Sequence, residues 1–233
     1  MKKNLAFTLA EVLITLGVIG IVAAMTLPAL ITRNQNKALE AALKKNYSVL
    51  QQAFERYQAD TGERLKPEDV SKRVNGTDPI GSLKSAIQPY LKVLKDCGQF
   101  IAASNACVSS AEGLKKYKTY SKKTLSTVSL FDDGQLLLSD GSLLLFENAQ
   151  GSTTAYITID VNGFLKNPNQ WGHDLFTFQL MSDGRLMPMG APGTNYYSND
   201  ARYCSSSSTH HLNGIGCTYY ALTEKDYFNN LPR

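Results

Sequence analysis

The chain has 233 residues, which is enough for one medium-sized domain and a membrane anchor. Its formal net charge is +4, and Lys2 and Lys3 at the N-terminus contribute two of these charges. So small a surplus does not indicate a polyanionic partner such as nucleic acid.

The N-terminal segment from Phe7 to Ile31 is apolar and carries a single charge, on Glu11. At about 1.5 Å per residue, a helix of this length crosses a hydrocarbon core of about 30 Å. Lys2 and Lys3 precede it, and positive charge stays in the cytoplasm, so we expect a single-pass inner-membrane protein whose C-terminal domain is periplasmic. The alternative is a signal peptide cut near Met25, but the core of such a peptide excludes an acid.

Glu11 is the feature of this segment that needs an explanation. A carboxylate inside a bilayer costs on the order of 2.5 kcal/mol or more and usually has a partner. No basic residue lies within the span. The partner is therefore a proton, another chain, or a new amine, and a cut before Phe7 would create such an amine.

The sequence MKKNLAFTLAEVLITLGVIGIVAAMTLPAL resembles the N-terminal segment of type IV pilins and type II secretion pseudopilins, with Phe7, Glu11 and Pro28 in register. The resemblance covers residues 1 to about 31, and Ala6 stands where the family usually has Gly. It implies a leader of residues 1–6, cleavage between Ala6 and Phe7, and N-methylation of Phe7. Residues 7–31 would then be the half of the first helix that spans the membrane and forms the filament core.

The resemblance also implies a set of partners and a function. The partners are other pilins or pseudopilins, the prepilin peptidase, the inner-membrane assembly platform and membrane lipid. The expected function is that of a structural subunit of a pilus or pseudopilus, in which Glu11 pairs with a neighbouring N-terminus. One alternative is a minor pilin that binds DNA, a surface or an exported protein. Another is an anchored periplasmic protein that never polymerises.

The helix is expected to continue through residues 32–61 as its periplasmic half. Apolar residues recur there at helical spacing, which predicts one face packed on the chain's own domain. They are Leu39, Leu43, Tyr47, Leu50, Phe54 and Tyr57. Gly62 suits a left-handed cap, and Pro28 should weaken the helix near Ala24.

Residues 62–123 are predicted to be a connecting region with a second helix from Ile80 to Lys95, kinked or delayed by Pro89. This region contains Cys97 and Cys107, and the other two cysteines are Cys204 and Cys217. The grouping favours two short-range disulfides, although four cysteines allow three pairings. Disulfides persist in secreted and periplasmic proteins, and neither group has the spacing of zinc ligands.

Residues 124–233 are predicted to form the sheet region, which includes the Cys204–Cys217 loop. Short apolar runs alternate here with Asp-Gly and Asn-Gly pairs, which are strong hairpin signals. The runs are STVSLF, QLLL, SLLLFE, AYITIDV, LFTFQL and RLMPMG. We therefore expect an antiparallel meander of four or five strands and an α+β fold, with a long N-terminal helix packed on the sheet as in pilins.

The stretch from Ile159 to Asp174 gathers turn-forming residues around the only tryptophan, Trp171. Asp160, Asn162 and Asp174 could offer oxygen ligands to calcium, but the EF-hand pattern is absent. The favoured interpretation is a structural turn in which Asp160 accepts backbone hydrogen bonds and Trp171 covers the sheet. No cofactor is then required, and calcium remains the alternative.

Residues 115–123 mix lysines with Tyr117 and Tyr120. Such a run could contact DNA, but a solvated connection before the sheet is favoured, so nucleic acid is not an expected partner. The chain has no Gly-rich phosphate loop, no Gly-x-Ser-x-Gly and no HExxH motif. We therefore do not expect an enzyme.

Overall fold

The computed structural model describes residues 8–70, 73–74, 78–79, 82–98, 106–127, 129–130, 132–148, 153–197 and 202–232. The chain divides into two compact units, Met1–Ala38 and Leu39–Arg233, and helix α1 (Leu9–Thr61) contributes to both. The long N-terminal helix and a six-stranded antiparallel sheet confirm the predicted α+β class.

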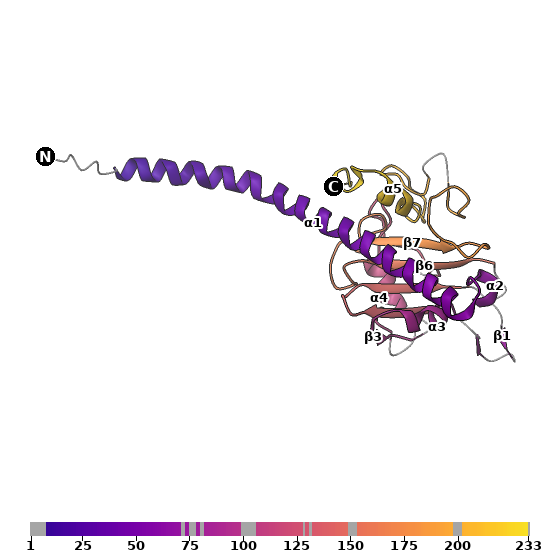
Figure 1. Cartoon of the computed structure of the whole chain (residues 1–233). Coiled ribbons are helices and arrows are strands. Elements are labelled where there is room, and N and C mark those ends of the chain that lie inside the picture. The colour runs from indigo at the N-terminus through magenta and orange to yellow at the C-terminus, as the bar shows by residue number, and fades with distance from the viewer. Residues whose placement is uncertain are drawn as a thin grey trace. The chain divides into compact units, whose positions relative to one another are not determined.

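The sheet lies in the second unit, and its strands follow one another in space as they do in sequence, each antiparallel to its neighbour (Figure 1). They are β3 (Val93–Asp96), β4 (Gly134–Leu138), β5 (Leu143–Glu147), β6 (Ala155–Asp160), β7 (Leu175–Leu180) and β8 (Leu186–Pro188). A separate two-stranded ribbon pairs β1 (Arg73–Val74) with β2 (Asp78–Pro79).

The helical elements after α1 are all short. They are α2 (Pro67–Val70), α3 (Leu83–Ile87), η1 (Gln88–Tyr90), α4 (Ser110–Lys116), α5 (Cys217–Thr223) and η2 (Tyr227–Asn229).

The part of α1 in the second unit packs on the sheet, as the apolar stripe predicts (Figure 1). Leu43, Leu50 and Phe54 are buried in the same core as strands β4 to β8, and Tyr47 stacks on Phe178 at 5.0 Å between ring centroids. The helix stops where expected. Gly62 adopts φ +81°, and its N–H donates to Gln58 O at 2.9 Å.

The central strands point successive side chains to opposite faces of the sheet, and both faces are buried. The face toward α1 carries large apolar side chains such as Phe146 and Ile157. The opposite face mixes apolar residues, among them Leu145 and Tyr156, with buried polar ones. These polar residues include Thr158, Asp160 and Thr177. The polar residues of these strands are therefore buried and hydrogen-bonded inside the domain, and they do not form a face exposed to solvent.

The predicted second helix, from Ile80 to Lys95, is helical only from Leu83 to Tyr90 in the described residues, and its prediction beyond Tyr90 is wrong. The structure ends α3 at Ile87, continues as η1 through Tyr90, and then forms strand β3. Pro89 lacks an N–H and clashes with the carbonyl four residues earlier, which disfavours continuation of this short α-helix, whereas the much longer α1 continues through Pro28. The residues beyond it pair with β4, with Val93 opposite Leu138.

Residues 124–233 contribute five strands to this sheet, β4 to β8, as predicted, and β3 adds a sixth strand from the connecting region. The run STVSLF is not a strand in its described residues, which form bends and turns. Asp140-Gly141 and Asp183-Gly184 do lie in the β4–β5 and β7–β8 hairpins, where both glycines have positive φ. Asp133-Gly134 does not turn the chain, because Gly134 is the first residue of β4.

Candidate functional site

The most unusual surface of the first unit is the apolar part of α1. Its large side chains from Leu9 to Ile31 are exposed, with Leu9 at 79% and Ile31 at 54% of full exposure. Helix α1 is long and apolar enough to cross a membrane. A continuous exposed apolar surface of this kind marks contact with lipid or with other proteins.

Glu11 lies at the start of this helix and forms a capping box with Thr8. The Thr8 N–H and its hydroxyl both donate to Glu11 Oε2 at 2.8 Å, and the Glu11 N–H donates to Thr8 Oγ1 at 3.2 Å. The bonds satisfy backbone groups that a helix N-terminus otherwise leaves without partners. We missed this role in the sequence, although Thr-x-x-Glu has the spacing of a capping box.

Of the other residues implicated in processing and assembly, Ala6 and Phe7 lie outside the described residues, and so does the leader of residues 1–6. Pro28 lies inside α1, which continues through it, and the hydroxyl of Thr32 donates to Pro28 O at 3.0 Å.

Comparison with protein families identifies the segment. Residues 1–27 match the family described as the prokaryotic N-terminal methylation motif. The chain carries the type IV pilin and pseudopilin signature. Comparisons with curated proteins and with solved structures find no match.

The signature has consequences for this pilin-like chain. It implies processing by a prepilin peptidase and polymerisation with other pilins, and together with the apolar helix it indicates membrane anchoring. Proteins with this signature are structural rather than enzymatic.

The pilin-like chain holds two disulfides, both in its second unit. Cys97 pairs with Cys107, and Cys204 pairs with Cys217. Cys97 is fully buried and its N–H donates to Gln135 O at 3.1 Å, which ties this bridge to strand β4.

The loop closed by Cys204 and Cys217 differs from the surface feature that the sequence suggests. Its second half, from Leu212 to Gly216, is buried. The fully buried Asn213 organises the first half, since its amide donates to Ser205 O at 2.7 Å and to Ser208 O at 3.0 Å. Only the serine- and histidine-containing half remains at the surface for partner contact.

The three calcium candidates lie at the β6–β7 connection, and their side chains form hydrogen bonds there. Asp160 accepts bonds from the Gly163 N–H at 2.8 Å and the Tyr117 hydroxyl at 3.1 Å. Asp174 accepts from the N–H groups of Asn169 at 2.8 Å and Gln170 at 2.6 Å. All four carboxylate oxygens therefore have hydrogen-bond donors.

Burial dominates the electrostatics of these two acids. It raises the pKa of Asp160 well above its usual value, with the nearby charge of Asp174 as the second cause. It raises the pKa of Asp174 to about 6, although the backbone N–H groups oppose this shift. Asn162 donates to Asn167 O at 3.2 Å. All three side chains therefore take part in hydrogen bonds within this connection.

The lysine-rich run does not present aromatic side chains for stacking on bases. Tyr117 is fully buried and Tyr120 is 8% exposed, and both pack inside the domain. The neighbouring lysines project outward, and Lys116 lies over the Phe164 ring at 4.4 Å. A base-stacking surface requires exposed aromatic residues, and neither tyrosine of this run is exposed.

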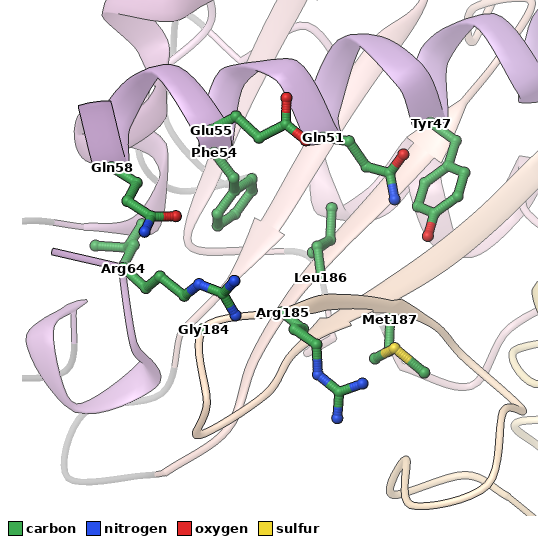
Figure 2. Close-up of a pocket in the computed structure, with 11 residues that line it drawn as sticks. Tyr47, Gln51, Phe54, Glu55, Gln58, Arg64, Gly184, Arg185, Leu186 and Met187 are labelled. Atoms are coloured by element: carbon green, nitrogen blue, oxygen red, sulfur yellow. The ribbon is translucent and has the colours of Figure 1, made fainter. Parts of the chain in front are cut away.

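A hollow of about 220 Å³ lies between the second-unit part of α1 and the β7–β8 hairpin (Figure 2). Tyr47 and Phe54 contribute its apolar wall, and Arg64 and Arg185 stand at its polar side. The described lining contains no nucleophile paired with a general base. The arrangement gives no support to catalysis at this place.

Proposed function

We propose that this chain is a prepilin-like structural subunit of a type IV pilus or a type II secretion pseudopilus. It is cut between Ala6 and Phe7, methylated at the new amine, and assembled through the apolar part of α1. The observation that carries the proposal is the combination of the signature over residues 1–27 with the continuous exposed apolar surface that follows.

The same helix can serve as membrane anchor and as filament core, because lipid and neighbouring helices both cover an apolar surface. Gly17 and Gly20 have no side chain and face open space in the single chain, which leaves room for a neighbouring helix at these positions. Small residues let helix backbones approach one another in lipid. Subunits can therefore leave the bilayer and pack on each other without exposing this surface to water.

Glu11 supplies the polar specificity of assembly in this proposal. Thr8 occupies Oε2, and the described residues give Oε1 no hydrogen-bond donor. A methylated amine on Phe7 of a neighbouring subunit can pair with this carboxylate. Pairing removes an isolated charge from the apolar contact, and this favours one register of neighbouring helices over others.

The proposed orientation places residues 39–233 in the periplasm. Lys2 and Lys3 precede the apolar segment and favour retention of the N-terminus in the cytoplasm. Two disulfides in the second unit fit an oxidising compartment.

Intact-mass analysis of the chain from the membrane fraction tests the proposal. The expected mass corresponds to loss of residues 1–6 and gain of one methyl group. The same chain from cells that lack the prepilin peptidase should keep its full mass. A mature N-terminus at Met1 in peptidase-containing cells, or a cut near Met25, would contradict the filament role.

A further inference from the structure

Three acidic side chains meet at one corner of the sheet, away from the sites considered above. Asp132 and Asp133 directly precede β4, and Glu147 is the last residue of β5. The antiparallel register places Gly134 opposite Phe146, and the Asp133 N–H donates to Phe146 O at 2.9 Å. The start of one strand therefore lies beside the end of the next.

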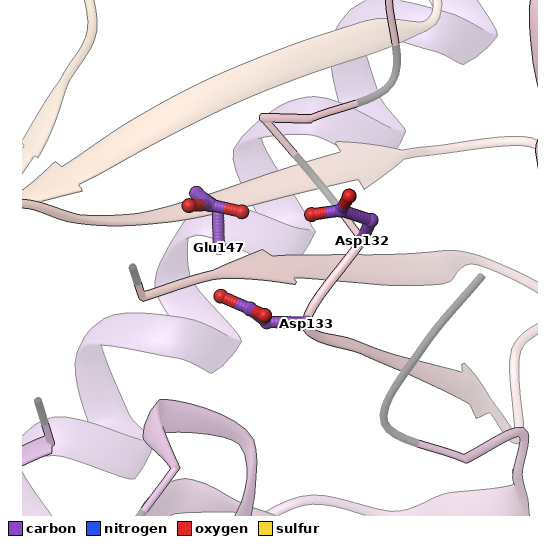
Figure 3. Close-up of side chains that lie close together, drawn as sticks. All are labelled: Asp132, Asp133 and Glu147. Carbon is purple, nitrogen blue, oxygen red and sulfur yellow. The ribbon is translucent and has the colours of Figure 1, made fainter. Parts of the chain in front are cut away.

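The three carboxylates converge on a small volume (Figure 3). One oxygen from each lies within 4.8 Å of the others. Glu147 is only 8% exposed, while Asp132 and Asp133 are half-buried at the edge of the cluster. The corner is thus closed on the Glu147 side and open to solvent on the other.

A second observation points to a ligand at this corner. Glu147 Oε2 is buried and has no hydrogen-bond partner in the described part of the chain, and its carboxylate faces those of Asp132 and Asp133. No lysine or arginine among the described residues forms an ion pair with the three acids. A buried carboxylate oxygen without a donor or a cation is energetically costly.

We propose that Asp132, Asp133 and Glu147 bind one calcium ion, which joins the start of β4 to the end of β5. Calcium prefers carboxylate oxygens at about 2.3–2.6 Å, so two ligands of one ion stand at most about 5 Å apart. The three oxygens lie within 4.8 Å of one another, which is inside this span. Magnesium demands stricter octahedral geometry and usually keeps several waters with only one or two carboxylates, so a cluster of three carboxylates suits calcium better.

The open side of the corner suits the remaining coordination. Calcium takes six to eight oxygens, and water completes the shell where a site faces solvent. The half-buried Asp132 and Asp133 leave this side accessible. The site is independent of helix assembly, so its test does not depend on the proposed filament role.

Calcium titration of the full chain in detergent, after treatment with a chelator, tests the site. Isothermal titration calorimetry should detect one ion per chain, and thermal unfolding should shift upward with calcium. Glu147→Gln keeps the side-chain shape and removes the charge, and Asp132→Asn does the same at the more exposed position. Each should weaken calcium binding by at least about tenfold, because affinity depends on the ligand charge.

Asp183→Asn is the matched control, since Asp183 is an exposed acid already paired with Arg185 at 2.6 Å. It should bind calcium as the unchanged chain does. Absence of binding by the folded chain up to about 10 mM calcium would overturn the proposal, as that exceeds the range of weak extracellular sites. Unchanged affinity in both site variants, or magnesium binding as tight as calcium binding, would also overturn it. Should Glu147→Gln fail to fold, as judged by circular dichroism, Asp132→Asn decides alone.

Discussion

Thr8 and Glu11 cap the N-terminus of α1 for one another, through two bonds of 2.8 Å to the carboxylate and one of 3.2 Å to the hydroxyl. The acid therefore has a local role within its own helix as well as the proposed role between subunits. Glutamine can replace glutamate in a capping box but carries no charge. This difference allows the two roles to be separated by substitution.

Glu11→Gln should leave the chain in the membrane but prevent its assembly. The cap is retained, and the amine of a neighbouring subunit loses its carboxylate. Removal of one partner of a buried ion pair costs about 3–5 kcal/mol. This cost lowers the equilibrium constant for each subunit addition by more than about 100-fold. Membrane fractionation measures insertion, and recovery of sheared filaments or of secreted protein measures assembly.

Thr8→Val is the matched variant for this experiment. It removes the hydroxyl of the cap at a cost of about 1 kcal/mol in helix stability and keeps the Glu11 charge. It should assemble far better than Glu11→Gln. Equal assembly defects in the two variants would show that Glu11 matters through the cap, and normal filaments from Glu11→Gln would contradict the pairing role.

The two disulfides should be found as Cys97–Cys107 and Cys204–Cys217 in protein isolated from the cell. Each closes a loop with a sequence separation of 10 or 13, which corresponds to roughly 3 kcal/mol in the chain-entropy model. Peptide mapping without reductant identifies the pairs. Double serine variants at each pair should lower the free energy of unfolding by about that amount. Crossed pairs or four free thiols would contradict the assignment.

Gly190→Ala should destabilise the second unit severely. Gly190 has φ +96°, and a Cβ there would stand 1.9 Å from the carbonyl oxygen of Gly216. Because that oxygen is backbone, the alanine can fit only if the chain from β8 to α5 moves apart. We expect a loss of about 4 kcal/mol or more in the free energy of unfolding, measured by urea denaturation.

Gly193→Ala is the control for backbone strain alone. Gly193 has φ +91°, and a Cβ there meets nothing within 4 Å. The variant should lose only about 1–2 kcal/mol. Similar losses in the two variants would show that the close approach of Gly190 to Gly216 is absent in solution.

His173 should make the second unit less stable as the pH falls below about 6.5. Burial, aided by the charge of Lys122, lowers the pKa of His173 to about 4. The unfolded chain accepts a proton below about pH 6.5 and the folded chain does so only near pH 4. This contribution to stability is therefore complete above pH 6.5 and is lost as pH falls toward 4, by up to about 1.4 kcal/mol per pH unit.

His173→Gln cannot take up this proton, so its free energy of unfolding should vary less steeply between pH 6.5 and 4. Urea unfolding followed by Trp171 fluorescence measures the difference. Identical slopes in His173→Gln and the unchanged chain would contradict the burial of His173.

The sequence alone determined the features that depend on neighbouring residues. Helical spacing from Leu39 to Tyr57 predicts the stripe that packs on the sheet, and Gly62 predicts the end of α1. The apolar segment with a single acid predicts the anchor, and most of this segment lies within the matched signature over residues 1–27. The capping box was equally readable, since Thr8 and Glu11 are three residues apart.

Only the tertiary structure decided which strands lie beside each other and what their faces meet. Leu91 and Leu94 continue the helical spacing of the preceding apolar residues. Pro89 nevertheless disfavours a helix here, and the residues after it form strand β3 because they pair with β4. Asp132 and Glu147 stand far apart in sequence, and the register of β4 and β5 brings their carboxylates together. Local periodicity reports which residues can share a face. Strand pairing depends on residues in other segments of the chain. It decides whether the side chains on that face contact solvent, a helix or an acidic side chain of the next strand.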